Sequence, residues 1–151
     1  MRYHQLSEVF GHLVTLNNAT LAFYERSLKV AKKERARMFL HYLIDKQKVR
    51  NEHLVALLAD GPIKIFEMWF DDEIDLQLLV YIEKLALDPS ASSDKILIIL
   101  LEVNEKIEIW LKSIAPLVIN SDAKEYIQDL IQYLHQKNQQ IMHGVQRMDD
   151  V

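Results

Sequence analysis

The sequence predicts a single all-α domain, and three observations support this fold class. The chain has 151 residues, which is enough for one domain with a sizeable buried core. Only three glycines and three prolines interrupt it, and apolar residues recur at helical rather than alternating spacing. Its hydrophobic fraction of 50% and charged fraction of 26% are ordinary for a globular protein. We therefore expect residues 1–151 to form one helical bundle domain.

The first part of the chain predicts two long helices, over residues 5–30 and 33–59. Each carries a stripe of apolar side chains at the spacing of a core-facing helix. A single helix through both would be about 80 Å long at roughly 1.5 Å per residue, and its stripe would have no partner. We expect a hairpin that turns around residues 31–34, and a long dimeric coiled coil is the alternative.

A long crossover is expected to follow. Gly61 and Pro62 end the second helix, because proline cannot continue it. Residues 63–90 then contain one shorter segment with helical spacing, which Asp71 or Asp72 can cap. The crossover is therefore predicted to contain a short helix of its own.

The rest of the chain predicts two more long helices, over residues 94–115 and 122–148. A serine-rich stretch precedes the first of them, and Pro116 stops it. Asp122 and Glu125 open the second in a pattern that resembles a capping box. Two helical pairs joined by one long crossover predict a four-helix up-down bundle.

Composition and charge exclude several classes of function. The net charge of −4 gives no general attraction to nucleic acid or to acidic membranes. The absence of cysteine excludes disulfides, thiol catalysis and cysteine-ligated metal sites. No stretch approaches the roughly 18 apolar residues of a membrane span, and the N-terminus lacks the apolar run of a signal peptide. We expect a cytoplasmic protein that binds neither nucleic acid nor membrane.

Cations interrupt the apolar stripe of the second helix. At 100° of rotation per residue, Lys46, Arg50 and His53 fall where leucine or isoleucine would be expected. Burial of an unpaired cation costs several kcal/mol, so these groups must reach solvent, pair with an acceptor or meet a ligand. Lys137 and Asn138 interrupt the stripe of the last helix, and they either complete the same polar layer or face solvent.

Two interpretations of this layer remain open. It is a pocket for an anionic or carboxylate ligand, because arginine offers a planar fork and lysine a point charge. Alternatively, it is a structural layer in which Lys46 pairs with Glu25 and a tyrosine hydroxyl. The second interpretation is favoured, since helical bundles use single polar layers to fix register. The candidate ligand-binding residues are Asn17, Tyr24, Glu25, Lys46, Arg50 and His53.

The chain resembles the ferritin-like superfamily, which includes rubrerythrin-type domains. The resemblance covers helix order along nearly the whole chain, and at residue level it rests on FYERS at 23–27 and RNEH at 50–53. It implies a ferritin-like bundle. Active members hold two metal ions with a carboxylate from each of two helices and a Glu-x-x-His from each of the other two.

The metal-binding pattern of that superfamily is incomplete in this chain. Arg50 stands three residues before His53, and Gln140 three before His143, where the pattern requires glutamate. Neither pair supplies the carboxylate that iron or manganese needs. We therefore expect no metal cofactor, and an atypical iron or manganese site is the alternative. The residues of that alternative site are Glu25, Glu52 and His53.

Bulky apolar residues in the crossover predict a surface that needs cover. They either pack over the bundle or form a homodimer interface, since patches rich in Trp, Phe and Met are typical of interfaces. The candidates are Phe66, Met68, Trp69 and Phe70.

The sequence thus predicts a non-catalytic, dimeric ferritin-like bundle that binds a protein partner or a small ligand at its polar layer. No serine or lysine with an adjacent base stands out as a nucleophile, which argues against an enzyme. The alternative function is a metal-binding protein with an atypical site and a stress or redox role.

Overall fold

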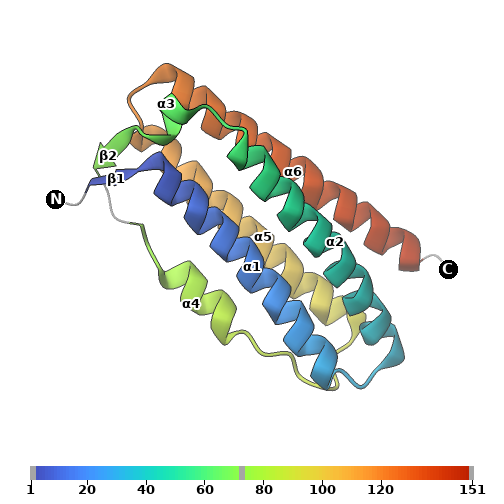
Figure 1. Ribbon diagram of the computed structural model, residues 1–151. Helices are drawn as coiled ribbons and strands as arrows, with labels where there is room; N and C mark the ends of the chain where they lie inside the picture. Colours follow the sequence, from blue (N-terminus) through green and yellow to red (C-terminus); the bar gives the residue numbers. More distant parts are fainter. Residues whose placement is uncertain (1–2, 72–73, 150–151) are drawn as a thin grey trace.

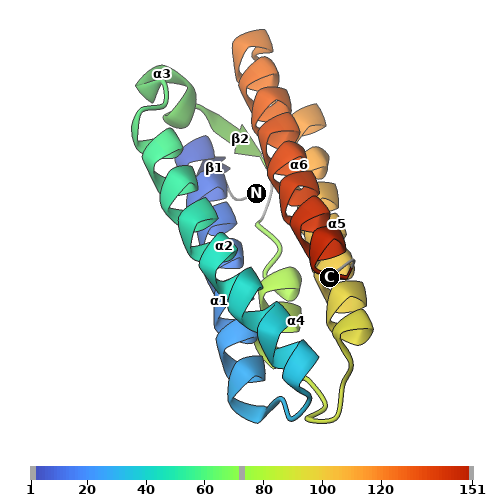
Figure 2. The same cartoon turned by 90° about the vertical axis from the view of Figure 1, so that its right-hand side faces the viewer.

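The computed structural model describes residues 3–71 and 74–149, and within them four long helices lie side by side (Figures 1 and 2). Apart from two short strands, the regular structure of this part is helical, which confirms the predicted all-α class. In the same ranges, no helix is long and apolar enough to cross a lipid bilayer. The long helices are α1 (Leu6–Val30), α2 (Glu34–Ala59), α5 (Ser93–Ile114) and α6 (Ser121–Asp149).

Helices α1 and α2 form an antiparallel hairpin, and the chain turns at residues 31–33, as predicted. The backbone N–H of Ala31 donates to the carbonyl of Ser27 at 2.9 Å. Arg37 Nη1 donates to the carbonyls of Leu28 and Ala31 at 2.8 and 3.0 Å. An arginine from the first turn of α2 therefore satisfies carbonyls that the end of α1 would leave unpaired.

The chain from 60 to 92 returns along the length of the molecule, so that α2 and α5 run in the same direction and α1 and α6 in the opposite one (Figure 1). The predicted short helix of this crossover is present as α4. A short strand of the crossover pairs antiparallel with another at the start of the chain, and no sequence pattern predicted this pairing. The elements are β1 (Tyr3–Gln5), α3 (Ile63–Phe66), β2 (Trp69–Asp71) and α4 (Gln77–Lys84).

Helix α4 begins later than the sequence predicted. The backbone N–H of Gln77 donates to Asp75 Oδ1 at 2.8 Å, so the helix starts after a turn at Asp75 and not at Asp71. Asp72, the other predicted cap, lies outside the described residues. Just past its other end, the carbonyl of Leu85 accepts a hydrogen bond from Arg26 of α1 at 3.1 Å. This bond helps to hold α4 against α1, on which it packs.

Ser92 and Asn120 cap the last two long helices. Ser92 Oγ accepts a backbone N–H at 3.3 Å, in agreement with the serine-rich stretch before α5. Asn120 Oδ1 accepts the backbone N–H of Ala123 at 3.0 Å, so α6 starts at Ser121. The predicted capping box that begins at Asp122 is wrong, because Asp122 already lies within the helix.

The core lies between the long helices, and most of the predicted apolar stripes are buried. Leu13 of α1, Val103 of α5 and Ile127 of α6 are at most 1% exposed. The stripe predicted for α2 is displaced by about one residue, or about 100° of helix rotation. Leu40 and Leu54 are buried there, and this displacement determines where the polar groups of α2 lie.

An aromatic cluster lies where α3 meets α1 and α6. The ring centroid of Phe66 is 4.8 Å from that of Phe10 and 5.6 Å from that of Tyr126. Gly61 lies against this cluster, because a Cβ atom at that position would clash with the Phe66 ring. Gly61 has no positive φ angle, so the glycine is needed for close approach and not for a left-handed conformation.

Two Gly→Ala variants test this packing. Gly61→Ala should lower the free energy of unfolding by about 1–3 kcal/mol, because the added methyl group overpacks the aromatic cluster. Gly11→Ala, on an exposed position of α1 with no atom near the new methyl group, should raise it by roughly 0.5–1 kcal/mol. Urea denaturation measures both, and equal stabilisation by the two variants would contradict the close approach at Gly61.

Candidate functional site

A buried polar layer connects α2, α5 and α6 near the middle of their lengths. Arg50 of α2 is only 4% exposed, and its Nη1 donates to Asn138 Oδ1 on α6. Asn138 Nδ2 in turn donates to Glu108 Oε1 on α5 at 3.2 Å. The same Glu108 oxygen lies 3.1 Å from Nδ1 of His135, at the surface of α6. One asparagine therefore links a buried cation on one helix to a carboxylate on another.

Arg50 remains a buried cation that is only partly paired. Burial lowers the pKa of its guanidinium, while the nearby Tyr24, Tyr133 and Glu108 act in the opposite direction. The group stays protonated at neutral pH, because the ordinary pKa of arginine is above 12. Within the described residues, neither Arg50 Nε nor the buried hydroxyl of Tyr24 has a hydrogen-bond partner. Burial also raises the pKa of that tyrosine, so the hydroxyl is neutral.

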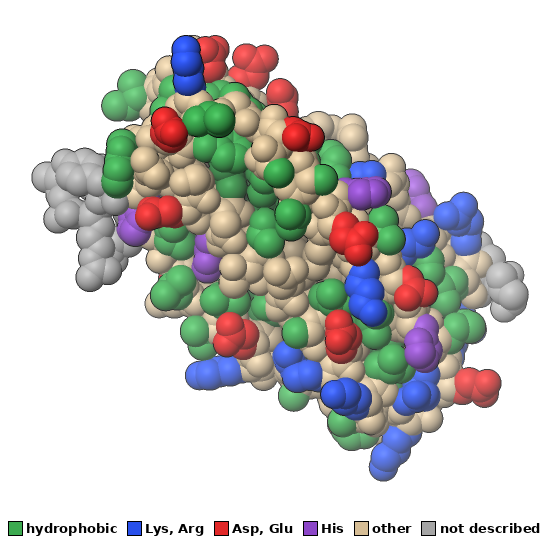
Figure 3. Space-filling model, viewed as in Figure 1, with side chains coloured by type: hydrophobic (Ala, Val, Ile, Leu, Met, Phe, Trp, Pro, Cys, Tyr) green, Lys and Arg blue, Asp and Glu red, His purple; other side chains and the backbone are tan. Residues whose placement is uncertain are grey.

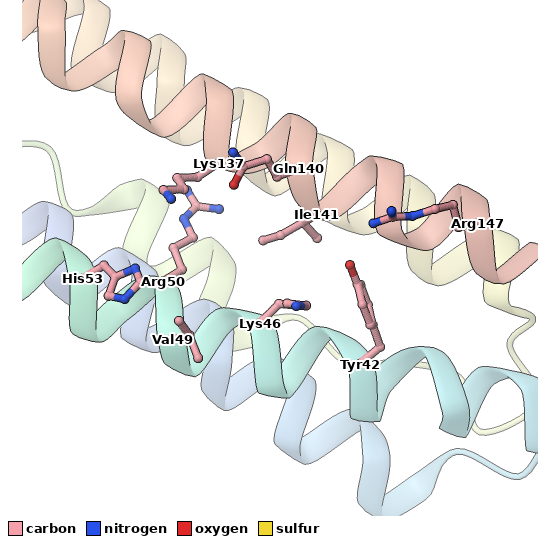
Figure 4. A pocket seen from close by; sticks show the side chains of 9 residues that line it. All are labelled: Tyr42, Lys46, Val49, Arg50, His53, Lys137, Gln140, Ile141 and Arg147. Atoms are coloured by element: carbon pink, nitrogen blue, oxygen red, sulfur yellow. The ribbon is translucent and has the colours of Figure 1, made fainter.

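A groove between α2 and α6 opens beside this layer (Figure 4). Its volume is about 270 Å³. In the part of the chain that the structure describes, no carboxylate lines it, whereas lysine and arginine side chains enter it from both helices. The lining residues are Tyr42, Lys46, Val49, Arg50, His53, Lys137, Gln140, Ile141 and Arg147. The groove is therefore a cationic site, with the buried Arg50 in its wall.

Tyr42 reaches across one end of the groove. Figure 4 shows its side chain pointing from α2 toward α6. Its hydroxyl lies against Gly144 of α6, where any Cβ atom would clash with it. The ammonium group of Lys46 lies 5.7 Å from the centroid of the Tyr42 ring, within the range of a cation–π contact. Gly144 therefore makes room for an aromatic side chain that forms part of the groove wall.

The structure brings together three of the six predicted ligand-binding residues. Lys46, Arg50 and His53 line the groove. Tyr24 is buried and lies near Arg50, but it does not line the groove. Glu25 is exposed on α1, so its predicted buried pair with Lys46, which is itself exposed, is wrong. Arg50 takes the buried position that the sequence had suggested for Lys46.

Asn17 belongs to a separate cluster of buried amides. Gln47 Nε2 donates to Asn17 Oδ1 at 3.3 Å and to Asn51 Oδ1 at 2.8 Å. Asn51 Nδ2 donates to the backbone carbonyl of Asn17 at 3.2 Å and to Asn18 Oδ1 at 3.2 Å. Three of these bonds join α2 to α1, and the bond between Gln47 and Asn51 lies within α2. The predicted polar layer is therefore two groups, an amide cluster and the Arg50 layer.

Sequence reasoning missed Gln47, Asn51 and Glu108. Gln47 and Asn51 are one helical turn apart and continue the buried face of Leu40 and Leu54, a spacing that could have revealed them. Glu108 follows the buried Ile107 of α5, and its side chain is only 15% exposed. The sequence allowed Lys137 and Asn138 either to complete the polar layer or to face solvent. In the structure, Asn138 completes the layer and Lys137 lines the groove.

The described side chains do not fit a two-metal centre. Glu25, Glu52 and His53 are all exposed, and the described residues contain no group of three His, Asp or Glu side chains placed to hold a metal ion. Arg50 instead introduces a fixed positive charge among the helices, which repels a metal cation. His143 is also exposed on α6.

The crossover residues proposed as an interface divide into two groups. Phe66 and Met68 are half-buried against the protein, so they pack over its side. Trp69 is 64% exposed. The side chain of Phe70 lies outside the described part of the structure. Packing of the crossover therefore explains the first two residues but leaves Trp69 on the surface.

The comparisons with known proteins add no relative. No family model matches the chain, and searches of curated proteins and of solved structures also returned no match. The geometry of the site is therefore the basis for its proposed function.

A double-mutant cycle tests the buried layer. Asn138→Leu should lower the free energy of unfolding by about 2–3 kcal/mol, because it leaves the Arg50 guanidinium without its amide partner. Arg50→Met combined with Asn138→Leu should regain at least about 1 kcal/mol of this loss, since the uncompensated buried charge is gone. Gln136→Leu, at an exposed position of α6, is the control. Additive effects of the two changes in urea denaturation would mean that the side chains are not coupled.

Proposed function

We propose that this protein is a non-catalytic binding protein that holds a small carboxylate or phosphate anion in the groove between α2 and α6. The observation that carries the proposal is the convergence of Lys46, Arg50, Lys137 and Arg147 on a groove whose described lining contains no carboxylate. Like charges brought together raise the free energy of the folded protein, and an anion bound among them lowers it.

The groove offers the donors that such an anion needs. The guanidinium groups of Arg50 and Arg147 can donate in a planar fork, and the lysine ammonium groups act as point charges. Tyr42 and Gln140 add neutral donors. Nothing among these residues pairs a nucleophile with a base, so the arrangement suits binding rather than catalysis.

The proposal includes a four-helix bundle with ferritin-like connectivity. It is supported by two antiparallel helical pairs joined by a crossover that runs the length of the molecule (Figure 1). In this proposal the cationic side chain of Arg50 lies among the helices where the family resemblance would imply metal ions, so the bundle carries a binding site of a different kind.

A homodimer in the cytoplasm is also part of the proposal. Figure 3 shows apolar side chains on the face that carries α3. Ile63 of α3 and Trp69 of β2 are 71% and 64% exposed. A shallow hollow between α1, α2 and α3 is lined by residues that include Phe10, Val55 and Phe66. These residues would supply the interface. Light scattering on the purified protein gives the molar mass, and twice the 17.7 kDa chain mass is expected.

The binding proposal is tested by thermal denaturation with citrate and phosphate, compared with sodium chloride at equal ionic strength. An anion present at about a hundredfold excess over its Kd should stabilise the protein by about 2.7 kcal/mol. Lys46→Gln with Lys137→Gln should lose most of the increase in Tm, because the groove then loses two of its cations.

The control for this experiment removes the same net charge elsewhere. Lys84 and Lys112 are exposed and do not line the groove, so Lys84→Gln with Lys112→Gln should keep the full increase in Tm. Citrate and phosphate also stabilise many proteins by exclusion from the surface. An equal increase in the wild type and in both variants would show that general effect and would refute the site.

A further inference from the structure

The cations of the groove fall into two groups, one at each end. Lys137 lies with its ammonium group 5.5 Å from the Tyr133 ring centroid, on the side where Arg50 also approaches Tyr133. Toward the other end, the ammonium group of Lys46 lies 5.7 Å from the centroid of the Tyr42 ring. Figure 4 shows Arg147 at this second end and His53 at the first. The positive charge of the groove is therefore divided and not centred on one point.

Apolar side chains separate the two groups. Ile141 of α6 lies between Arg50 and Arg147 (Figure 4), and Val49 of α2 also lines the groove. Lys137 and Arg147 are ten residues apart on one helix, which corresponds to roughly 15 Å at about 1.5 Å per residue. This spacing places Lys137 and Arg147 almost three helical turns apart, toward opposite ends of the groove.

We infer that the groove binds an elongated dianion, with a carboxylate or phosphate group at each end and a largely apolar spacer between them. This inference rests on the proposed function and adds the class of ligand. One anionic group meets Arg50 and Lys137, the spacer lies on Val49 and Ile141, and the second group meets Lys46 and Arg147. Once one end is bound, the other end is held at high effective concentration, so a dianion of matching length binds more tightly than a monoanion.

A series of straight-chain dicarboxylates tests the length of the ligand. Isothermal titration with malonate, glutarate, adipate and suberate, at constant ionic strength, should show affinity that rises with chain length. Suberate should bind at least about tenfold more tightly than malonate or the monoanion hexanoate, which corresponds to about 1.4 kcal/mol.

The second end is tested by substitution. Lys46 and Arg147 are exposed, so Lys46→Gln with Arg147→Gln removes the charge of that end without disturbing the core. This variant should bind suberate no more tightly than hexanoate, because only one end of the groove can then hold an anionic group. Lys84→Gln with Lys112→Gln should leave the wild-type order of affinities intact.

The possible results separate this inference from the proposed function. Equal affinity for malonate, suberate and hexanoate, with binding lost in Lys46→Gln with Lys137→Gln, would refute the elongated ligand and leave an anion site for one group. Absence of binding by every carboxylate and by phosphate in the wild type would refute both.

Discussion

The structure depends on how the buried guanidinium of Arg50 is satisfied. A charge that is almost fully removed from water must have a partner, and here the partner is the amide of Asn138, which also donates to Glu108. The three side chains come from three helices, so they must lie at the same level along the axis of the bundle to form these hydrogen bonds. A shift of α6 by one turn would leave the cation unpaired, so this small network sets the alignment of α2, α5 and α6.

The neutral character of that partner has a second effect. A carboxylate in direct contact would cancel the charge of Arg50, whereas an amide satisfies a hydrogen bond and leaves the charge in place. The amide cluster of Asn17, Gln47 and Asn51 has no charge, and it connects α2 to α1 from an adjacent part of the buried face of α2. Helix α2 thus carries one polar group that only joins helices and another whose charge extends into the groove.

Local signals explain what could be predicted from the sequence. The helix order, the hairpin at 31–33 and the crossover follow from periodicity and from breakers such as Pro62, all of which act over a few residues. The phase of α2 was misassigned, because apolar Val49 is exposed while polar Gln47 is buried, so the apolar side chains alone do not mark its buried face. The groove and the β1–β2 pair require residues far apart in the chain to meet, and no local pattern encodes that contact.

The pairing of β1 with β2 limits how two copies of the chain could exchange parts. Domain swapping would require the crossover to straighten and carry α5 and α6 to a neighbour. The crossover is fastened near its start by the strand pair and by the bond from the Leu6 N–H to the Met68 carbonyl, and beyond α4 by the bond from Arg26 to Leu85. A swapped assembly would lose both attachments, so the fold favours self-contained subunits.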